Sequence, residues 1–359
     1  MVEWLAGNRI RGTTAERTST TNGFNPVDAL TGGWKKLTSS TSVYSSGNED
    51  TITITGLDNK KYYMVLVNTN GSGNTNAKIR IGFGGTISTS GYCNRYQING
   101  TGGSGNSQDG ANKVNGNNTT GTDGSNYDWY IIENISGKEK LIMGWNGSTK
   151  GTSTDDVERA EMVTKHTGTG VMDSIQLIND LAGANFDTGT EVVVLGWDPA
   201  DTHTDNFWTK LATATGSSSS ASFDTGTFAA KKYLFVTAYA ENTNDFKCIF
   251  NDGASGTYTR RYSGNFANDV VGTSSTHFGL SWGTTKVFFT QMIANPSNSY
   301  KIIHQTGSEV ATDNSVGTQP TSFDSVTQWR NNAQITKMSF SRAGGNFSGD
   351  EKIIVWGSD

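Results

Sequence analysis

The segment ANFDTGTEVVVLGWD, from Ala184 to Asp198, decides the fold because the chain closes on a diverged copy of it, GNFSGDEKIIVWGSD from Gly345 to Asp359. Each copy has an Asn-Phe pair, a short polar turn and an apolar run that contains Gly and Trp. A short apolar run rich in β-branched residues is typical of a buried β-strand. A chain that contains the same closing strand twice is predicted to contain the same domain twice.

Further segments match in the same order, at an interval of about 160 residues, which is too long for a solenoid repeat and indicates duplicated domains. The fifth match below places His166 and His304 at equivalent positions, which favours a structural role for both. The matches are GGWKKLTSSTS (32–42) with NFWTKLATATG (206–216), KKYYMVLV (60–67) with KKYLFVTA (231–238), CNRYQING (93–100) with TRRYSGNF (259–266), EKLIMGW (139–145) with TKVFFTQ (285–291), MVTKHTG (162–168) with KIIHQTG (301–307), and IQLINDLAGANF (175–186) with ITKMSFSRAGGNF (335–347).

Each copy consists of strand patterns. DTITIT (50–55) alternates polar and apolar residues, as a strand with one wet face does. YYMVLVNT (62–69) and YLFVTAYAE (233–241) are more apolar and are predicted to be central strands buried on both sides. About eight strands per copy without intervening helices imply antiparallel pairing in a two-sheet sandwich. The predicted fold is therefore all-β, with two tandem jelly-roll-like antiparallel β-sandwich domains that arose by internal duplication.

The predicted domains follow from the repeat. The first sandwich covers 31–198, with a long Gly/Asn-rich insertion at 99–126, and the second covers 206–359. Residues 199–205 join them as a linker. A loop longer than about 15 residues is usually functional or disordered, so the insertion is a candidate contact between neighbouring molecules.

Residues 1–30 have no counterpart before the second copy and are predicted to form an extended N-terminal arm. The alternative is a tail that tucks an apolar pair into the first domain. The residues proposed for assembly through the arm are Trp4, Leu5, Arg9, Arg11 and Arg17.

Composition limits the classes of function. Only 17% of the residues are charged, the net charge is −5, and no basic stripe is present, so nucleic-acid binding is not expected. No segment has the apolar length of a signal peptide or a membrane span, which predicts synthesis in the cytoplasm and no membrane partner. Cys93 and Cys248 lie in predicted strands and are expected to be buried free thiols.

No residue constellation predicts catalysis. The four histidines are scattered, and no nucleophile motif is present. The acidic stretch DDVERAE (155–161) is interpreted as a solvated turn rather than a pair of glycosidase carboxylates. We therefore expect no enzymatic activity and no cofactor. Calcium is an alternative, since DPADTHTD (198–205) and NDLAGANFD (179–187) carry oxygen ligands, but the first of these segments is better explained as the linker.

Aromatic residues offer a candidate glycan contact. Tyr96, Trp145 and Tyr262 lie near loops or in the recurring Arg-Tyr strands, and their rings are able to stack on sugar faces. The alternative is that the tyrosines belong to the core, with an arginine stem packed alongside. The residues leave both interpretations open.

These motifs resemble virion structural proteins of tailed bacteriophages. The resemblance is carried by LAGNRIRGTTAERT (5–18), GWKKL (33–37), KKYYMVLV (60–67) and the closing VVVLGW (192–197) and IIVWG (353–357). Such proteins decorate or cement capsids or form tail-fibre-like parts, and they carry tandem β-sandwich modules. The resemblance implies a non-enzymatic protein that assembles in symmetric copies.

The leading hypothesis is thus a structural component of a phage particle, located in the virion, whose partners are copies of itself and other virion proteins. The second hypothesis is a carbohydrate-binding or host-attachment module that contacts host surface glycans. The third is a microbial surface or filament protein.

Overall fold

The structure is a computed structural model of the 359-residue chain. It describes residues 33–37, 43–44, 47, 49–69, 75–99, 101–114, 125–149, 157–181, 183–241, 246–253, 258–264, 269–279, 286–310, 320–342 and 344–359. Within these ranges the regular elements are all strands. The predicted arm, with Trp4, Leu5, Arg9, Arg11 and Arg17, lies outside the described residues.

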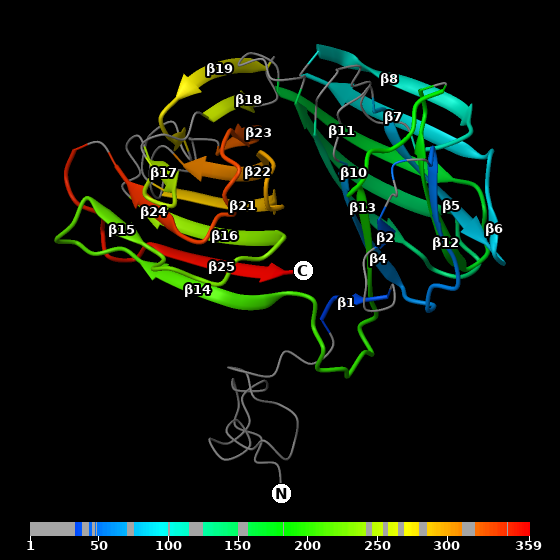
Figure 1. Ribbon diagram of the computed structural model, residues 1–359, viewed down its shortest axis with the longest axis horizontal. Helices are drawn as coiled ribbons and strands as arrows, with labels where there is room; N and C mark the ends of the chain where they lie inside the picture. The colour runs from blue at the N-terminus through cyan, green and yellow to red at the C-terminus, as the bar shows by residue number, and fades with distance from the viewer. Residues whose placement is uncertain are drawn as a thin grey trace, which may run out of the picture.

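The first half of the chain forms a sandwich of two antiparallel sheets, here called sandwich 1 (Figure 1). Its large sheet has the order β1-β13-β4-β9-β10-β11-β7-β8, with β2 also paired to β13, and its small sheet has the order β3-β12-β5-β6. The strands are β1 (Lys35–Lys36), β2 (Val43–Tyr44), β3 (Thr51–Ile54), β4 (Tyr62–Thr69), β5 (Ala77–Phe83), β6 (Thr86–Ile87), β7 (Tyr92–Ile98), β8 (Thr101–Ala111), β9 (Asn126–Glu133), β10 (Lys140–Thr149), β11 (Val157–His166), β12 (Met172–Asn179) and β13 (Glu191–Trp197).

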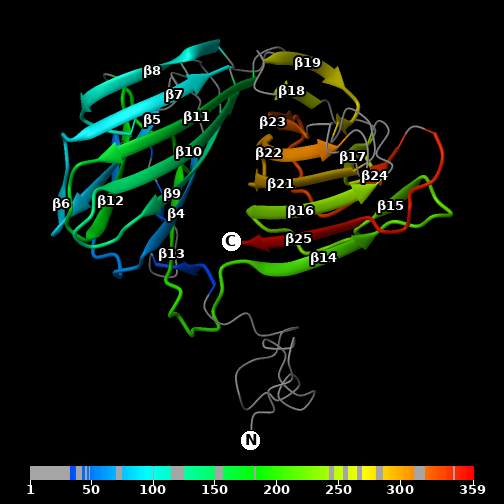
Figure 2. The same ribbon diagram turned by 180° about the vertical axis from the view of Figure 1, so that it is seen from behind.

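The second half forms sandwich 2 with the same plan. Its large sheet has the order β14-β25-β16-β21-β22-β23-β18-β19 and its small sheet the order β15-β24-β17-β20. The strands are β14 (Thr209–Thr215), β15 (Ser222–Asp224), β16 (Tyr233–Glu241), β17 (Lys247–Phe250), β18 (Tyr258–Gly264), β19 (Val270–Ser275), β20 (Phe278–Gly279), β21 (Lys286–Ala294), β22 (Lys301–Val310), β23 (Thr321–Trp329), β24 (Met338–Ser341) and β25 (Lys352–Ser358). Seen from behind, the two large sheets descend in matching order on either side of the molecule (Figure 2).

Each sandwich encloses its own core between its two sheets, as alternating apolar residues require. The core of sandwich 1 includes Ile79, Ile132 and Leu177, and that of sandwich 2 includes Phe250, Phe289 and Trp329. The predicted all-β duplication is confirmed by the two identical strand orders.

Matching contacts fix which residues correspond in the two sandwiches. The Tyr92 hydroxyl accepts the Ile81 N–H at 2.8 Å, and the Tyr258 hydroxyl accepts the Phe250 N–H at 3.0 Å. Tyr92 therefore corresponds to Tyr258, as the sequence match predicted.

Glycines give a second pair of matching contacts. A Cβ on Gly196 would meet Leu37 at 2.5 Å, and one on Gly357 would meet Leu211 at 2.5 Å, so both positions exclude a side chain. The sequence match of Leu37 with Leu211 is confirmed by this packing.

Two of the sequence matches were wrong by one strand. Lys140 pairs with His166 across β10 and β11, while Lys301 pairs with Trp329 across β22 and β23. Both lysines are buried and donate to loop carbonyls, and burial lowers the pKa of each. EKLIMGW therefore corresponds to KIIHQTG, and His166 corresponds to Trp329 rather than to His304.

The Gly/Asn-rich insertion also differs from expectation. Its segment Thr101–Ala111 is the edge strand β8, which pairs with β7 as β19 pairs with β18 in sandwich 2. Residues 115–124 of the insertion lie outside the described residues. Similarly, DDVERAE is not a solvated turn from Val157 onward, because β11 is an interior strand whose Glu158 and Arg159 are buried.

Candidate functional site

The two sandwiches pack against each other through the outer faces of their large sheets. A third apolar cluster, separate from the two cores, fills this junction. Its buried members from sandwich 1 are Met64, Leu66, Tyr127, Val157, Val193 and Leu195, and those from sandwich 2 are Phe207, Tyr233, Met292, Ala294, Ile302 and Val326. This cluster explains why β4 is buried on both faces, as its apolar sequence predicted.

Polar contacts frame the junction. His304 Nε2 lies 2.9 Å from the carbonyl oxygen of Tyr127, and burial lowers the pKa of His304 to about 4. The Tyr233 hydroxyl donates to the Glu191 carboxylate at 3.1 Å. Arg159 pairs with Asp269 at 2.7 Å. These bonds join elements of both sandwiches and satisfy polar groups that the junction removes from water.

The linker is fastened to sandwich 1. Lys60 pairs with Asp201 at 2.5 Å and Lys35 with Asp205 at 3.0 Å. The carboxylates on which the calcium hypothesis depended here are thus neutralised by lysines. In the part of the chain that the structure describes, no group of three or more His, Cys, Asp or Glu side chains is placed to hold a metal ion.

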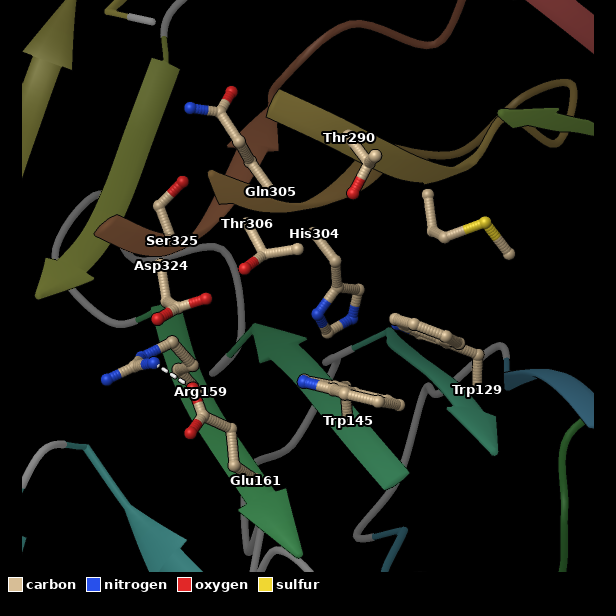
Figure 3. A pocket seen from close by; sticks show the side chains of 11 residues that line it. Trp129, Trp145, Arg159, Glu161, Thr290, His304, Gln305, Thr306, Asp324 and Ser325 are labelled. Atoms are coloured by element: carbon tan, nitrogen blue, oxygen red, sulfur yellow. Dashed lines mark hydrogen bonds and ion pairs between the residues drawn. The ribbon is translucent and has the colours of Figure 1, made fainter. Parts of the chain in front are cut away.

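A small cavity lies inside the junction (Figure 3). Trp129 and Trp145 stack on its lower side with ring centroids 4.0 Å apart, and His304 points toward them from sandwich 2. Arg159 and Glu161 form an ion pair beside them. The cavity measures about 20 Å³, which is room for little more than one water molecule. It is therefore part of the packing between the sandwiches rather than a ligand pocket.

The larger hollow lies on the outer face of the large sheet of sandwich 1, beyond the junction. It measures about 690 Å³. Its lining includes four apolar side chains from neighbouring strands that lie outside the core, and we call them the open patch: Ile131, Leu141, Met143 and Val163. The exposed fractions are 55% for Leu141, 46% for Met143 and 53% for Val163. Contiguous exposed apolar side chains mark an interaction surface.

Charged and polar side chains surround the open patch. Arg95, Asp109, Glu133 and Lys165 line the same hollow, and Tyr62 lies at its edge. An apolar centre with a polar rim is the usual anatomy of a protein–protein interface. This surface was not among the predicted sites. The signal for it in the sequence is KLIMGW, which has apolar residues at successive positions, where one wet face would require alternation.

The predicted glycan contacts do not form one platform. Tyr96 is half-buried and packs against the core of sandwich 1, on the opposite face of the sheet from Trp145. Tyr262 lies on β18 of sandwich 2, at the position that corresponds to Tyr96. The Arg260 guanidinium lies 4.5 Å from the centre of the Tyr262 ring. Trp145 stacks on Trp129 in the junction.

The remaining predicted features are placed as follows. Both cysteines are free; Cys248 is buried and Cys93 is half-buried. No helix in the described ranges has the length and apolarity needed to cross a membrane.

No protein-family model and no curated protein matches this chain. Among solved structures, it is similar to the LG1–3 region of the laminin alpha2 chain, with a TM-score of 0.18, 10% identity, and coverage of 85% of this chain and 63% of that one. It is also similar to domains LG4–5 of the mouse laminin alpha1 chain, with a TM-score of 0.18, 8% identity, and coverage of 89% and 92%. The chain thus spans less than two thirds of the first of these structures.

Proposed function

We propose that this chain is a non-enzymatic structural component of a virus particle, of the kind that decorates or cements a phage capsid or belongs to its tail. The observation that carries the proposal is the open patch, where three large apolar side chains are about half exposed on a regular sheet. Leaving such a surface in water is unfavourable, and covering it with another protein recovers about 25 cal/mol per Å².

Two further features support an assembling part. The two sandwiches are locked by an apolar cluster and by Arg159–Asp269 and Tyr233–Glu191 contacts, which makes a preorganised building block. The resemblance to tailed-phage virion proteins, stated from the sequence, is the reason for choosing a virus particle over another assembly.

The test is the composition of purified particles. Particles released by cells that encode the chain are banded by density, and their proteins are quantified by mass spectrometry. We expect this chain in a fixed ratio to the main shell or tail protein. We expect Leu141→Asp to be lost from the particles, while Val270→Asp, which changes an exposed valine outside the open patch, is retained. Particles of normal composition that contain none of this chain would refute the proposal.

A further inference from the structure

The contact between the two sandwiches uses different surfaces on each. On sandwich 2 four of the buried residues form what we call the covered patch: Met292, Ile302, His304 and Val326. On sandwich 1 the residues opposite are Leu66, Tyr127, Gly147 and Val193, which we call the receiving surface. The contact is therefore heterologous, since the two partners do not present the same residues.

The covered patch of sandwich 2 corresponds residue by residue to the open patch of sandwich 1. Leu141 follows the buried Lys140 as Ile302 follows Lys301. In sandwich 1, Met143 pairs across the sheet with both Ile131 and Val163. In sandwich 2, His304 pairs in the same way with Met292 and Val326.

Burial at this patch is opposite in the two sandwiches. Ile302 is 1% exposed, whereas its counterpart Leu141 is 55% exposed. Val326 is 1% exposed, whereas Val163 is 53% exposed. The same apolar surface is thus covered in one copy of the module and uncovered in the other.

The receiving surface has an uncovered counterpart too. Tyr127 pairs with Gly147 as Phe288 pairs with Ser308, and Leu66 pairs with Val193 as Thr237 pairs with Ile354. We call Thr237, Phe288, Ser308 and Ile354 the open receiving surface. Tyr127 is completely buried, whereas Phe288 is 55% exposed.

From these two uncovered surfaces we infer that copies of this chain join head to tail. The open patch of one copy receives the open receiving surface of the next, and this contact repeats between chains the one that joins the two sandwiches within a chain. The inference rests on the proposed role as an assembling component and names the partner as a second copy of the chain. Repetition of a heterologous contact gives a closed ring or an open filament, depending on the rotation per step.

Charges at the rim fit this partner. Within the chain, Tyr233 and Lys232 contact Glu191. The cross-strand register gives Lys352 as the counterpart of Glu191, opposite Tyr239. A cation thus replaces an anion at the rim of the open receiving surface.

At the rim of the open patch, an anion takes the place of an uncharged residue. Ala294 lies beside Tyr233 across the sheet, but Glu133 lies beside Tyr62, the counterpart of Tyr233. Lys61, the counterpart of Lys232, pairs with Asp198 at 3.6 Å. Glu133 and Lys352 are therefore placed to attract each other between copies.

The experiment uses the full chain and two variants, with molar mass measured by light scattering from about 1 to about 100 μM, the range in which interfaces of modest strength assemble. Leu141→Asp disables the open patch, and Phe288→Asp disables the open receiving surface. The wild type is expected to exceed its monomer mass of 38.4 kDa increasingly with concentration. Each variant alone is expected to stay at that mass.

Mixing the two variants is the decisive arm. Phe288→Asp still has its open patch, and Leu141→Asp still has its open receiving surface, so an equal mixture is expected to form dimers that cannot grow further. A symmetric contact between two open patches would instead be insensitive to Phe288→Asp and would not be rescued by mixing. Val270→Asp, at a 50% exposed valine on β19, serves as the matched control and is expected to assemble like the wild type.

A wild type that remains monomeric over this range, or a mixture that forms no dimer, overturns the inference. All three substitutions are at exposed positions, so each variant is expected to fold. Unfolding curves that overlay that of the wild type check this. The failure of this inference can be distinguished from the failure of the proposed function. A monomeric chain that is present in particles refutes only the inference. A head-to-tail oligomer that is absent from particles refutes only the role in the virion.

Discussion

Asn134 and Asn295 make the same hydrogen bonds in the two sandwiches. Asn134 donates to the Lys60 carbonyl at 3.0 Å and accepts the Met172 N–H at 2.8 Å. Asn295 donates to the Lys231 carbonyl at 2.7 Å and accepts the Ile335 N–H at 2.7 Å. Each asparagine is buried. It ties the end of one large-sheet strand to the loop before another, β4 or β16, and to the chain at or just before a small-sheet strand, β12 or β24.

Removing either asparagine side chain should destabilise its sandwich. Asn134→Ala or Asn295→Ala leaves a buried N–H and a part-buried carbonyl without these partners. The cost is about 1–3 kcal/mol for an unsatisfied buried group. Urea unfolding followed by tryptophan fluorescence measures the loss. Asn332→Ala, at an exposed asparagine, is the control, and equal midpoints for all three variants would contradict the role assigned to the pair.

Acid should weaken the junction through His304. The unfolded chain protonates a histidine at about pH 6.5, but burial lowers the pKa of His304 in the folded chain to about 4. Between these values the unfolded state binds more protons, so stability falls as the pH falls from about 6.5 to about 4.

The variant His304→Met isolates this effect, since methionine occupies the corresponding position, 143, in sandwich 1. Its unfolding free energy should vary less over that pH range than that of the wild type. Other buried groups, such as Asp128, titrate in both proteins and cancel in the difference. Parallel pH profiles would rule out the assignment.

Gly147 should tolerate no side chain. A Cβ at this position would lie 2.7 Å from Val326 Cγ1 and 2.8 Å from His304 Nε2, closer than packed atoms approach. Gly147→Val is expected to destabilise the chain by about 1–3 kcal/mol, the usual cost of overpacking. Ser308→Val changes the corresponding exposed position of sandwich 2, and at submicromolar concentration its melting temperature should match the wild type.

The N-terminal arm remains a prediction from the sequence. Deletion of residues 1–25 should abolish incorporation into particles if Trp4, Leu5 and the three arginines anchor the chain. The truncated protein should keep its melting temperature, because the strands that the structure describes in both sandwiches lie at Lys35 and beyond. Unchanged incorporation, measured by quantitative mass spectrometry, would show that the anchor lies elsewhere.

The sequence predicted the duplication but misplaced part of its register. KIIHQTG was matched to MVTKHTG on the shared His and Thr-Gly, yet β22 corresponds to β10 and not to β11. Neighbouring strands of an antiparallel sheet carry similar alternating patterns, so short matches between diverged copies slip by one strand. Cross-strand pairs such as Lys140–His166 fix the register, and they are visible only in the folded chain.

The contact between the two sandwiches could not be predicted from the sequence, for a different reason. YYMVLVNT and YLFVTAYAE were both predicted to be buried on two sides, but β16 is only half-buried at Phe235, Thr237 and Tyr239. Whether an outward face is covered depends on which sandwich packs on it, which is a tertiary property. The polar residues on the outward face of β16 were the signal in the sequence that this face is not covered.

The Trp129–Trp145 stack is an intrinsic spectroscopic probe of the contact between the two sandwiches. The two indoles are 4.0 Å apart and inclined by only 10°, so their electronic transitions couple, and they sit where sandwich 1 meets His304 of sandwich 2. Separation of the halves would admit solvent to these rings before either core is disturbed. Their emission, which depends on the solvent around the rings, therefore reads out the joint without any attached label, whereas their circular dichroism depends on the pairing of β9 with β10 within sandwich 1. The two signals allow loosening of the joint to be followed separately from melting of the sheets.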